Sequence, residues 1–169
     1  MMMNRLAGFK YAALCCCFLA LAACTKKTQP DLDAGLNGGG AGMAAPGSKA
    51  EFSTNVGDRV YFMEDHSDLT PEASDTLSKQ ANWLKQYAKV TVQVEGHADE
   101  RGTREYNIAL SARRATNVRN FLIQQGVPGN RISSIAYGKE RPAALCDAEQ
   151  CWTQNRRAVT VITGGARTS

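Results

Sequence analysis

The spacing of apolar and polar residues changes several times along this chain, and each change predicts a new element. The apolar tripeptide at 60–62 predicts a short strand. A helix is predicted over 71–87, because Thr70 can cap it, Pro71 suits its first position, and apolar residues then recur at helical spacing. At 90–95, valines alternate with polar residues, which is typical of a strand that is buried on one face only.

The alternation of elements continues in the second half of the chain. Apolar residues at helical spacing predict a helix over 104–125, which is expected to stop at Gly126 with Pro128 just beyond. Residues 132–137 predict a third strand, and 158–162 predict a fourth after a long loop.

This order of elements predicts an α/β fold in two layers. Successive strand-helix-strand units imply parallel crossovers. The half-polar pattern of the second strand indicates that helices cover only one face of the sheet. The predicted core consists of the inward positions of these elements: Val60, Phe62, Leu77, Leu84, Val92, Val94, Ile108, Ala115, Val118, Leu122, Ile135, Val159 and Val161.

The first 24 residues have the pattern of a lipoprotein export signal. Arg5 and Lys10 precede an apolar run over 11–23, which is far shorter than the roughly 20 residues needed to span a bilayer. The run ends in Leu-Ala-Ala before Cys24, which predicts cleavage of residues 1–23 and lipidation of Cys24. The alternative is an ordinary secretory signal in which Cys24 is incidental. Threonine rather than aspartate at position 25 favours the outer membrane.

Residues 24–50 are expected to form a lipidated N-terminus and a flexible tether. Residues 25–50 are rich in Gly, Ala and Pro and have almost no large apolar side chain, so they cannot bury enough surface to offset the entropy of ordering. A leader without a reach function is the alternative. A single domain is expected over 51–169. Without residues 1–23, the chain has 18 Lys and Arg against 16 Asp and Glu, a balance that does not indicate a nucleic-acid partner.

The turn between the second strand and the second helix is the most informative segment. Residues 95–102 read Glu-Gly-His-Ala-Asp-Glu-Arg-Gly, and 106–115 read Tyr-Asn-Ile-Ala-Leu-Ser-Ala-Arg-Arg-Ala. This run resembles the signature of the OmpA-like peptidoglycan-binding domain family, and the resemblance extends from about residue 56 to 162. It implies a two-layer sandwich of the OmpA-like β-α-β-α-β-β order, with a mixed four-stranded sheet, helices on one face and a non-catalytic role.

Asp99 and Arg114 are the candidate ligand residues. They lie fifteen positions apart, and Leu110 shares a helix face with Arg114. A carboxylate opposite a guanidinium, with an apolar wall between them, suits a ligand that carries an ammonium and a carboxylate on one carbon at the end of an aliphatic arm. The side-chain end of meso-diaminopimelate in peptidoglycan is such a group. The resemblance implies the same three residues. From the residues alone, Asp99 could instead be a turn residue that bonds its own backbone, and Arg114 a solvated charge.

Further residues near this turn have smaller expected roles. The resemblance implies that the loop around Glu64 and Asp65 makes peripheral contacts to the ligand, although relatives have a different sequence there. Tyr106 and Asn107 are expected to pack against and cap the loop, and Arg113 is expected to be a surface charge.

The segment Asn155-Arg156-Arg157 resembles the family as well and is expected to brace the loop beside the site. His97, two residues before Asp99, suggests a metal or an enzyme. Because His66 is the only other histidine, a three-ligand zinc site would depend on carboxylates. We therefore expect His97 to be a packed turn residue and the protein to hold neither a metal nor a cofactor. The sequence has no nucleophile elbow, phosphate loop or paired catalytic carboxylates, so hydrolysis of the cell wall is the weaker rival to binding it.

Cys146 and Cys151 are the cysteines that remain once the signal is removed and Cys24 is lipidated. In an exported chain an even pair predicts a disulfide, with two free thiols as the alternative. A ring this small stabilises a fold by roughly 2 kcal/mol in the chain-entropy model. Its expected effect is to rigidify one loop.

These features predict an outer-membrane lipoprotein whose periplasmic domain binds peptidoglycan without a covalent bond and so couples the membrane to the cell wall. The resemblance implies a second role as a scaffold in the Tol system, with the periplasmic propeller protein TolB as a partner and a part in envelope integrity and cell division. A flagellar-stator protein has the same kind of domain, but it would need an uncleaved transmembrane helix.

Overall fold

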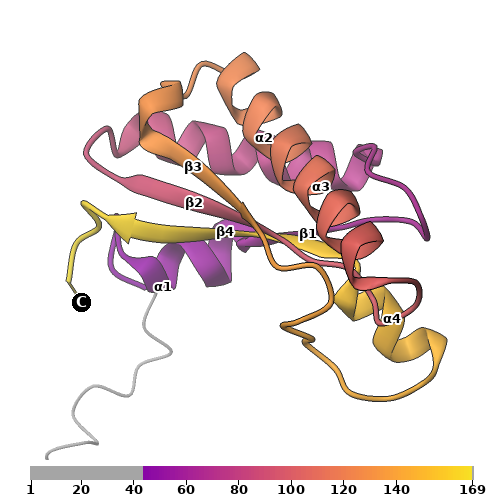
Figure 1. The fold of residues 1–169 in the computed structure, drawn as a ribbon. Helices are drawn as coiled ribbons and strands as arrows, with labels where there is room; N and C mark the ends of the chain where they lie inside the picture. Colours follow the sequence, from indigo (N-terminus) through magenta and orange to yellow (C-terminus); the bar gives the residue numbers. More distant parts are fainter. Residues whose placement is uncertain (1–43, 169) are drawn as a thin grey trace, which may run out of the picture. The chain divides into compact units, whose positions relative to one another are not determined.

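A computed structural model describes residues 44–168, in which two long helices pack on one four-stranded sheet (Figure 1). The strands are β1 (Arg59–Tyr61), β2 (Thr91–Gly96), β3 (Ile132–Ala136) and β4 (Arg157–Gly164), and the long helices are α2 (Pro71–Gln86) and α3 (Arg104–Gln124). The spatial order is β1-β4-β2-β3, in which β4 is antiparallel to both neighbours and β2 is parallel to β3. The predicted mixed sheet and the order of its main elements are confirmed.

Both long helices lie on the same face of the sheet, which confirms the two-layer sandwich (Figure 1). Their starts agree with the prediction because both are capped by local signals. The Thr70 hydroxyl accepts a hydrogen bond from the amide of Ala73 at 3.2 Å, and the Thr103 hydroxyl accepts one from the amide of Tyr106 at 3.2 Å.

Helix α3 approaches strand β2 very closely at Gly96. A Cβ atom at this position would lie 1.9 Å from the carbonyl oxygen of Ser111 in α3, so a glycine is required. This contact fixes the helix directly behind the turn that carries Asp99.

The core lies between the sheet and the two helices. Nine of the predicted core residues are buried there: Val60, Phe62, Leu77, Leu84, Val92, Val94, Ala115, Val118 and Leu122. Trp83 and Phe52 extend this core at one side, where their rings lie 4.9 Å apart. Ile108 is only half-buried.

The prediction was wrong for the inward positions of β3 and β4. Val161 and Ile135 are 37% exposed and Val159 is half-buried, because these side chains belong to the face that no long helix covers. The strand register gives the reason: Val92 pairs with Ile132 on one side and Ile162 on the other. Ile132 of β3 and Ile162 of β4 are therefore buried under the long helices, as are the residues of β4 that share this face of the sheet.

The buried face of β4 includes a threonine, which the hydrophobic pattern did not favour. The Thr160 hydroxyl donates to Oε1 of Gln80 at 2.8 Å, and Nε2 of Gln80 donates to the carbonyl of Gly57 at 2.7 Å. Both side chains are almost completely buried, and these bonds satisfy them.

The domain includes residues that the sequence assigned to the tether. Ser48 is buried and caps the short helix α1 (Lys49–Glu51), which continues into a π-helical segment at Phe52–Gly57. The backbone of Gly47 accepts a hydrogen bond from the amide of Arg167 at 2.9 Å, near the C-terminus. Gly47 and Ser48 are thus buried against the domain, a few residues before the expected boundary at residue 50. Cys24 and the rest of the expected tether lie outside the described residues.

The loop between β3 and β4 contains the predicted disulfide and a helix that the sequence did not predict. Cys146 and Cys151 are bonded, with their Cα atoms 5.7 Å apart. Helix α4 (Glu149–Asn155) begins inside this ring and leads directly into β4. Within residues 44–168, no helix is long and apolar enough to cross a membrane.

Candidate ligand-binding site

A cavity of about 240 Å³ lies where the loops after β1 and β2 meet the start of α3. It brings together all five predicted ligand residues and four others in its wall: Glu64, Asp65, Asp99, Arg101, Gly102, Tyr106, Asn107, Leu110 and Arg114. Three of these side chains are acidic and two are arginines, so the cavity presents charges of both signs.

Arg114 is the most deeply buried charge of this site, with no exposed surface. Its guanidinium donates to three backbone carbonyls: Nε to His66 at 2.8 Å, one terminal nitrogen to His97 at 2.9 Å and the other to Met63 at 3.2 Å. No carboxylate of residues 44–168 forms an ion pair with it. Burial lowers the pKa of Arg114 to about 10, and the negative charge of Asp99 opposes that shift. Arg114 is therefore a buried cation that forms no direct ion pair with a carboxylate of the described residues, and it is not the solvated helix charge that was the alternative.

The guanidinium of Arg114 also determines the course of the loop after β1. A guanidinium has five N–H donors, and the three carbonyls use three of them. Two of those carbonyls belong to Met63 and His66, the ends of a turn in which the amide of His66 donates to the carbonyl of Met63 at 3.2 Å and Asp65 has a positive φ of 57°. The other two N–H groups of Arg114, which lines the cavity, form no hydrogen bond within residues 44–168.

Asp99 faces Arg114 from the end of β2, and its carboxylate is held by two other arginines. Arg101 donates to it at 2.6 Å and 3.3 Å through its side chain and at 3.2 Å through its amide. Arg156 donates to it at 3.3 Å. Burial by itself would raise the pKa of Asp99, but the bonds from Arg101 and Arg156 outweigh it and lower that pKa. Asp99 thus remains charged, and it also forms the local backbone bond of the alternative interpretation.

Further walls of the cavity come from helix α3 and from the loop after β1. Leu110 is 4% exposed and lines the cavity one helical turn before Arg114. The hydroxyl of Tyr106 donates to Asp65, and Glu64 forms an ion pair with Arg101 at 2.8 Å. The side chain of Glu64 thus faces an arginine of the site rather than open solvent alone.

Other predicted roles near the site follow from local contacts. Asn107 is buried and donates to the carbonyl of Arg101 at 2.7 Å, so it caps the loop as expected, whereas Tyr106 is part of the cavity wall. Arg113 is exposed. Asn155 accepts from the amides of residues 143 and 144 and so braces the neighbouring loop.

His97 is packed at the end of β2, 2% exposed, as the sequence predicted. Neither ring nitrogen has a hydrogen-bond partner in the described part of the chain, and Nε2 lies 3.7 Å from a carboxylate oxygen of Glu95. Burial, followed by the charges of Arg157 and Arg141, lowers the pKa of His97 to about 4. In residues 44–168, no group of three or more His, Cys, Asp or Glu side chains is arranged to hold a metal ion.

Sequence reasoning missed the partners of Asp99. Arg101 lies in the quoted motif, but nothing in its spacing indicates that it binds the carboxylate two residues earlier. Arg156 was expected only to brace a loop, and it reaches Asp99 across 57 positions of sequence. Glu149, which binds Arg156 at 2.5 Å, belongs to a helix that the sequence did not predict.

Comparisons with known proteins agree with this fold and extend over most of the chain. The OmpA family model matches residues 61–157. The peptidoglycan-associated lipoprotein of Brucella melitensis is 55% identical over 149 residues, which cover 88% of this chain and 89% of that protein. The peptidoglycan-associated lipoprotein of Agrobacterium fabrum is 56% identical over 149 residues, 88% of this chain and 84% of that protein.

Solved structures show the same architecture. The crystal structure of the peptidoglycan-associated lipoprotein from Burkholderia pseudomallei matches with a TM-score of 0.61 at 38% identity, over 63% of this chain and 90% of that chain. The C-terminal domain of Helicobacter pylori MotB matches with a TM-score of 0.60 at 24% identity, over 63% of this chain and 84% of that chain. The second match bears on the fold alone.

Proposed function

Since the chain belongs to the OmpA family and matches peptidoglycan-associated lipoproteins over most of its length, we propose that it binds peptidoglycan through the side-chain end of meso-diaminopimelate. In this proposal the protein is anchored to the outer membrane by lipid on Cys24, and its domain holds the cell wall without a covalent bond. The membrane and the wall are thereby coupled mechanically.

The observation that carries the ligand assignment is the unpaired charge of Arg114. A buried guanidinium that lacks a counter-ion, with two donors left, favours a carboxylate from a ligand. Asp99 stands across the same cavity and is charged, which favours an ammonium on the other side. Leu110 supplies the apolar wall for the methylene arm.

An incoming ammonium has to share Asp99 with the two arginines. The Arg101 side chain is 32% exposed and also binds Glu64, whereas the Arg156 side chain is 6% exposed and is fixed by further bonds. Arg101 is therefore the partner that yields its place on the Asp99 carboxylate. The ligand exchanges one ion pair for another, and the unmatched charge of Arg114 provides the net gain.

A second role, as a scaffold for a TolB-like periplasmic protein in envelope integrity and cell division, has support from the rim of the cavity. Met63 is 65% exposed and Tyr106 is 43% exposed, and both adjoin the proposed ligand site. Large exposed apolar side chains next to a polar cavity suit a protein interface. A partner at this surface would compete with the cell wall. We propose no catalytic activity, in keeping with relatives whose names describe association with peptidoglycan.

The test is retention of the full chain on purified sacculi. We expect strong retention on diaminopimelate-type sacculi and at least about tenfold weaker binding to lysine-type sacculi, because lysine lacks the carboxylate that would meet Arg114; that ratio corresponds to about 1.4 kcal/mol. Asp99→Ala should lose most of the binding, by about 2 to 5 kcal/mol. Arg113→Ala, with its exposed arginine, is the matched control. Equal retention of a folded Asp99→Ala variant and the parent chain would remove this site and leave the scaffold role.

A further inference from the structure

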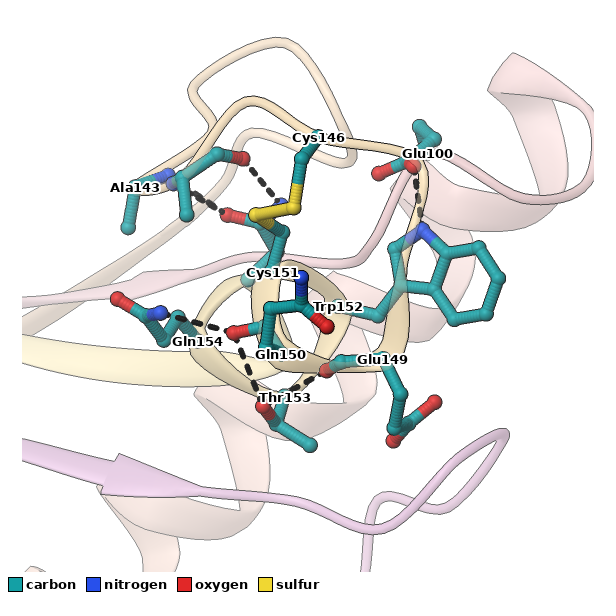
Figure 2. Close-up of a disulfide and its surroundings, with 11 residues drawn as sticks. Glu100, Ala143, Cys146, Glu149, Gln150, Cys151, Trp152, Thr153 and Gln154 are labelled. Carbon is teal, nitrogen blue, oxygen red and sulfur yellow. Dashed lines mark hydrogen bonds between the residues drawn. A yellow bond between two sulfur atoms is a disulfide. The ribbon is translucent and has the colours of Figure 1, made fainter.

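Helix α4 contacts the ligand site from outside the cavity. Trp152 donates through its indole N–H to the carboxylate of Glu100, the residue between Asp99 and Arg101 (Figure 2). The guanidinium carbon of Arg101 lies 4.1 Å from the centre of the Trp152 ring. One side chain of α4 therefore contacts both residues that follow Asp99.

A second residue of the same helix acts on the other partner of Asp99. Glu149 accepts a hydrogen bond from Arg156 at 2.5 Å, and the opposite terminal nitrogen of that guanidinium binds Asp99 at 3.3 Å. Arg156 also donates to the carbonyl of Phe62 at 3.3 Å and is 5% exposed. This arginine is thus shared between two carboxylates in a buried position.

The ion-pair network around Asp99 contains more negative than positive charges. Arg101 and Arg156 contribute two positive charges, and Asp99, Glu64 and Glu149 contribute three negative ones. The network therefore has one negative charge in excess, which matches a single ligand ammonium. If Glu149 were neutral, Asp99 would be the one remaining ion-pair partner of Arg156 among residues 44–168, and Arg156 would compete more strongly with a ligand ammonium.

The disulfide places Glu149 within a closed ring. Cys146 and Cys151 enclose residues 147–150, and Trp152 follows the second cysteine directly (Figure 2). Helix α4 has no side-chain cap at Ala148, so the disulfide is the side-chain constraint that lies at its start.

From these contacts we infer that α4 with its disulfide is a positioning element of the ligand site, in which Glu149 draws Arg156 away from Asp99 and thereby sets the affinity for the ligand ammonium. This inference rests on the proposed function. It gives the disulfide a role in ligand selectivity beyond the local stiffening expected of so small a ring.

The experiment compares two soluble muropeptides that differ only at the side-chain amino group of diaminopimelate, which is free in one and acetylated in the other. Binding of each to the full chain is measured by calorimetry. The parent chain should prefer the free amine. Glu149→Gln keeps the shape of the side chain and removes its charge, and it should bind the free-amine muropeptide about threefold to fivefold more weakly, with the acetylated one unchanged.

Asp147→Asn is the matched control, because Asp147 is exposed in the same disulfide ring and its replacement by asparagine removes one negative charge, as Glu149→Gln does. It should behave like the parent chain. The double variant Cys146→Ser/Cys151→Ser should prefer the free amine less strongly than the parent chain, as Glu149→Gln should. An unchanged preference would overturn the role of the disulfide.

The outcomes separate this inference from the function on which it rests. If the parent chain binds and prefers the free amine, but Glu149→Gln matches Asp147→Asn, the inference alone is wrong. Equal weakening of both muropeptides by Glu149→Gln would indicate a general structural role and would also overturn it. If the parent chain does not distinguish the two muropeptides, the ammonium assignment at Asp99 fails and the inference fails with it.

Discussion

Replacement of Arg114 by alanine should damage the fold as well as the ligand site. The guanidinium binds the carbonyls of Met63, His66 and His97, which come from the loops after β1 and β2. Its removal leaves three acceptors without their donor in a region where Arg114 has no exposed surface. The loops on both sides of the cavity would lose their common point of attachment.

The magnitude follows from two opposing contributions. Burial lowers the pKa of Arg114 to about 10, and this shift from the ordinary value of an arginine corresponds to roughly 3 kcal/mol against the buried charge. Three hydrogen bonds from a charged donor contribute about 1.5 to 3 kcal/mol each, so together they outweigh that cost. We expect Arg114→Ala to lower the free energy of unfolding by about 3 kcal/mol, within the range found when one partner of a buried charged contact is removed.

Equilibrium urea denaturation followed by tryptophan fluorescence measures this loss, since Trp83 reports on the core and Trp152 on the region of the site. The control is Arg113→Ala, because the neighbouring arginine is exposed and should change the stability by less than about 0.5 kcal/mol. A loss below about 1 kcal/mol for Arg114→Ala would refute the view that this side chain organises the loops. Loss of ligand binding in the same variant proves little about the ligand, so the functional test rests on Asp99.

Three further predictions concern other parts of the chain. His97 becomes protonated below pH 6.5 in the unfolded chain, whereas in the folded chain the pKa of His97 is about 4. The free energy of unfolding should therefore fall by up to roughly 3 kcal/mol as the pH drops from 6.5 to 4. Urea titrations of the His97→Gln variant should lack this part of the decrease. Gly96→Ala should cost about 3 kcal/mol or prevent folding, because the added Cβ would meet the carbonyl oxygen of Ser111 at 1.9 Å, and thermal denaturation would expose an error if the variant melted like the parent. Cys24→Ala should yield unacylated protein in the soluble periplasmic fraction, and mass spectrometry of the parent N-terminus without acyl chains would contradict the anchor.

Local signals explain which elements could be predicted from the sequence. Thr70 and Thr103 cap the two long helices, and the valines of β2 alternate without interruption. Each of these signals lies within the element that it defines, so no knowledge of the partner strands is needed. The boundaries of the long helices and strands accordingly differ from the prediction by only one or two residues.

Strand β4 shows what local patterns leave open. Its inward face is fixed by pairing with β2, which aligns Thr160 with Val94 and Ile162 with Val92. Within the strand itself, Val159 and Val161 are the more apolar positions and favour the opposite parity. The threonine is tolerated inside because Gln80, eighty positions away, accepts its hydroxyl. The alternation of apolar and polar residues within one strand cannot indicate a hydrogen-bond partner so far away in the sequence.

The ligand site has the same division between local and distant information. Asp99 and Arg114 could be proposed from the turn and the helix that carry them, because spacing along one helix and one strand end fixes where both emerge. Of the two arginines on Asp99, Arg156 comes from a distant segment, and its second carboxylate partner, Glu149, lies on a short helix whose start has no capping side chain. That helix begins within a disulfide ring and contacts Arg101 through Trp152, and neither contact can be read from the apolar pattern of its seven residues.

Arg114 connects stability and recognition in one side chain. Its three carbonyl bonds hold the walls of the cavity together, yet within residues 44–168 they leave its charge without a direct ion pair. The fold therefore keeps a cation buried at a cost, and a ligand carboxylate would remove that cost by supplying the missing partner. On this reasoning, ligand binding should raise the stability of the loops after β1 and β2 more than that of the far end of the sheet. Slower amide hydrogen exchange at residues 63–66 in the presence of a diaminopimelate muropeptide would reveal this, whereas uniform protection along the chain would count against it.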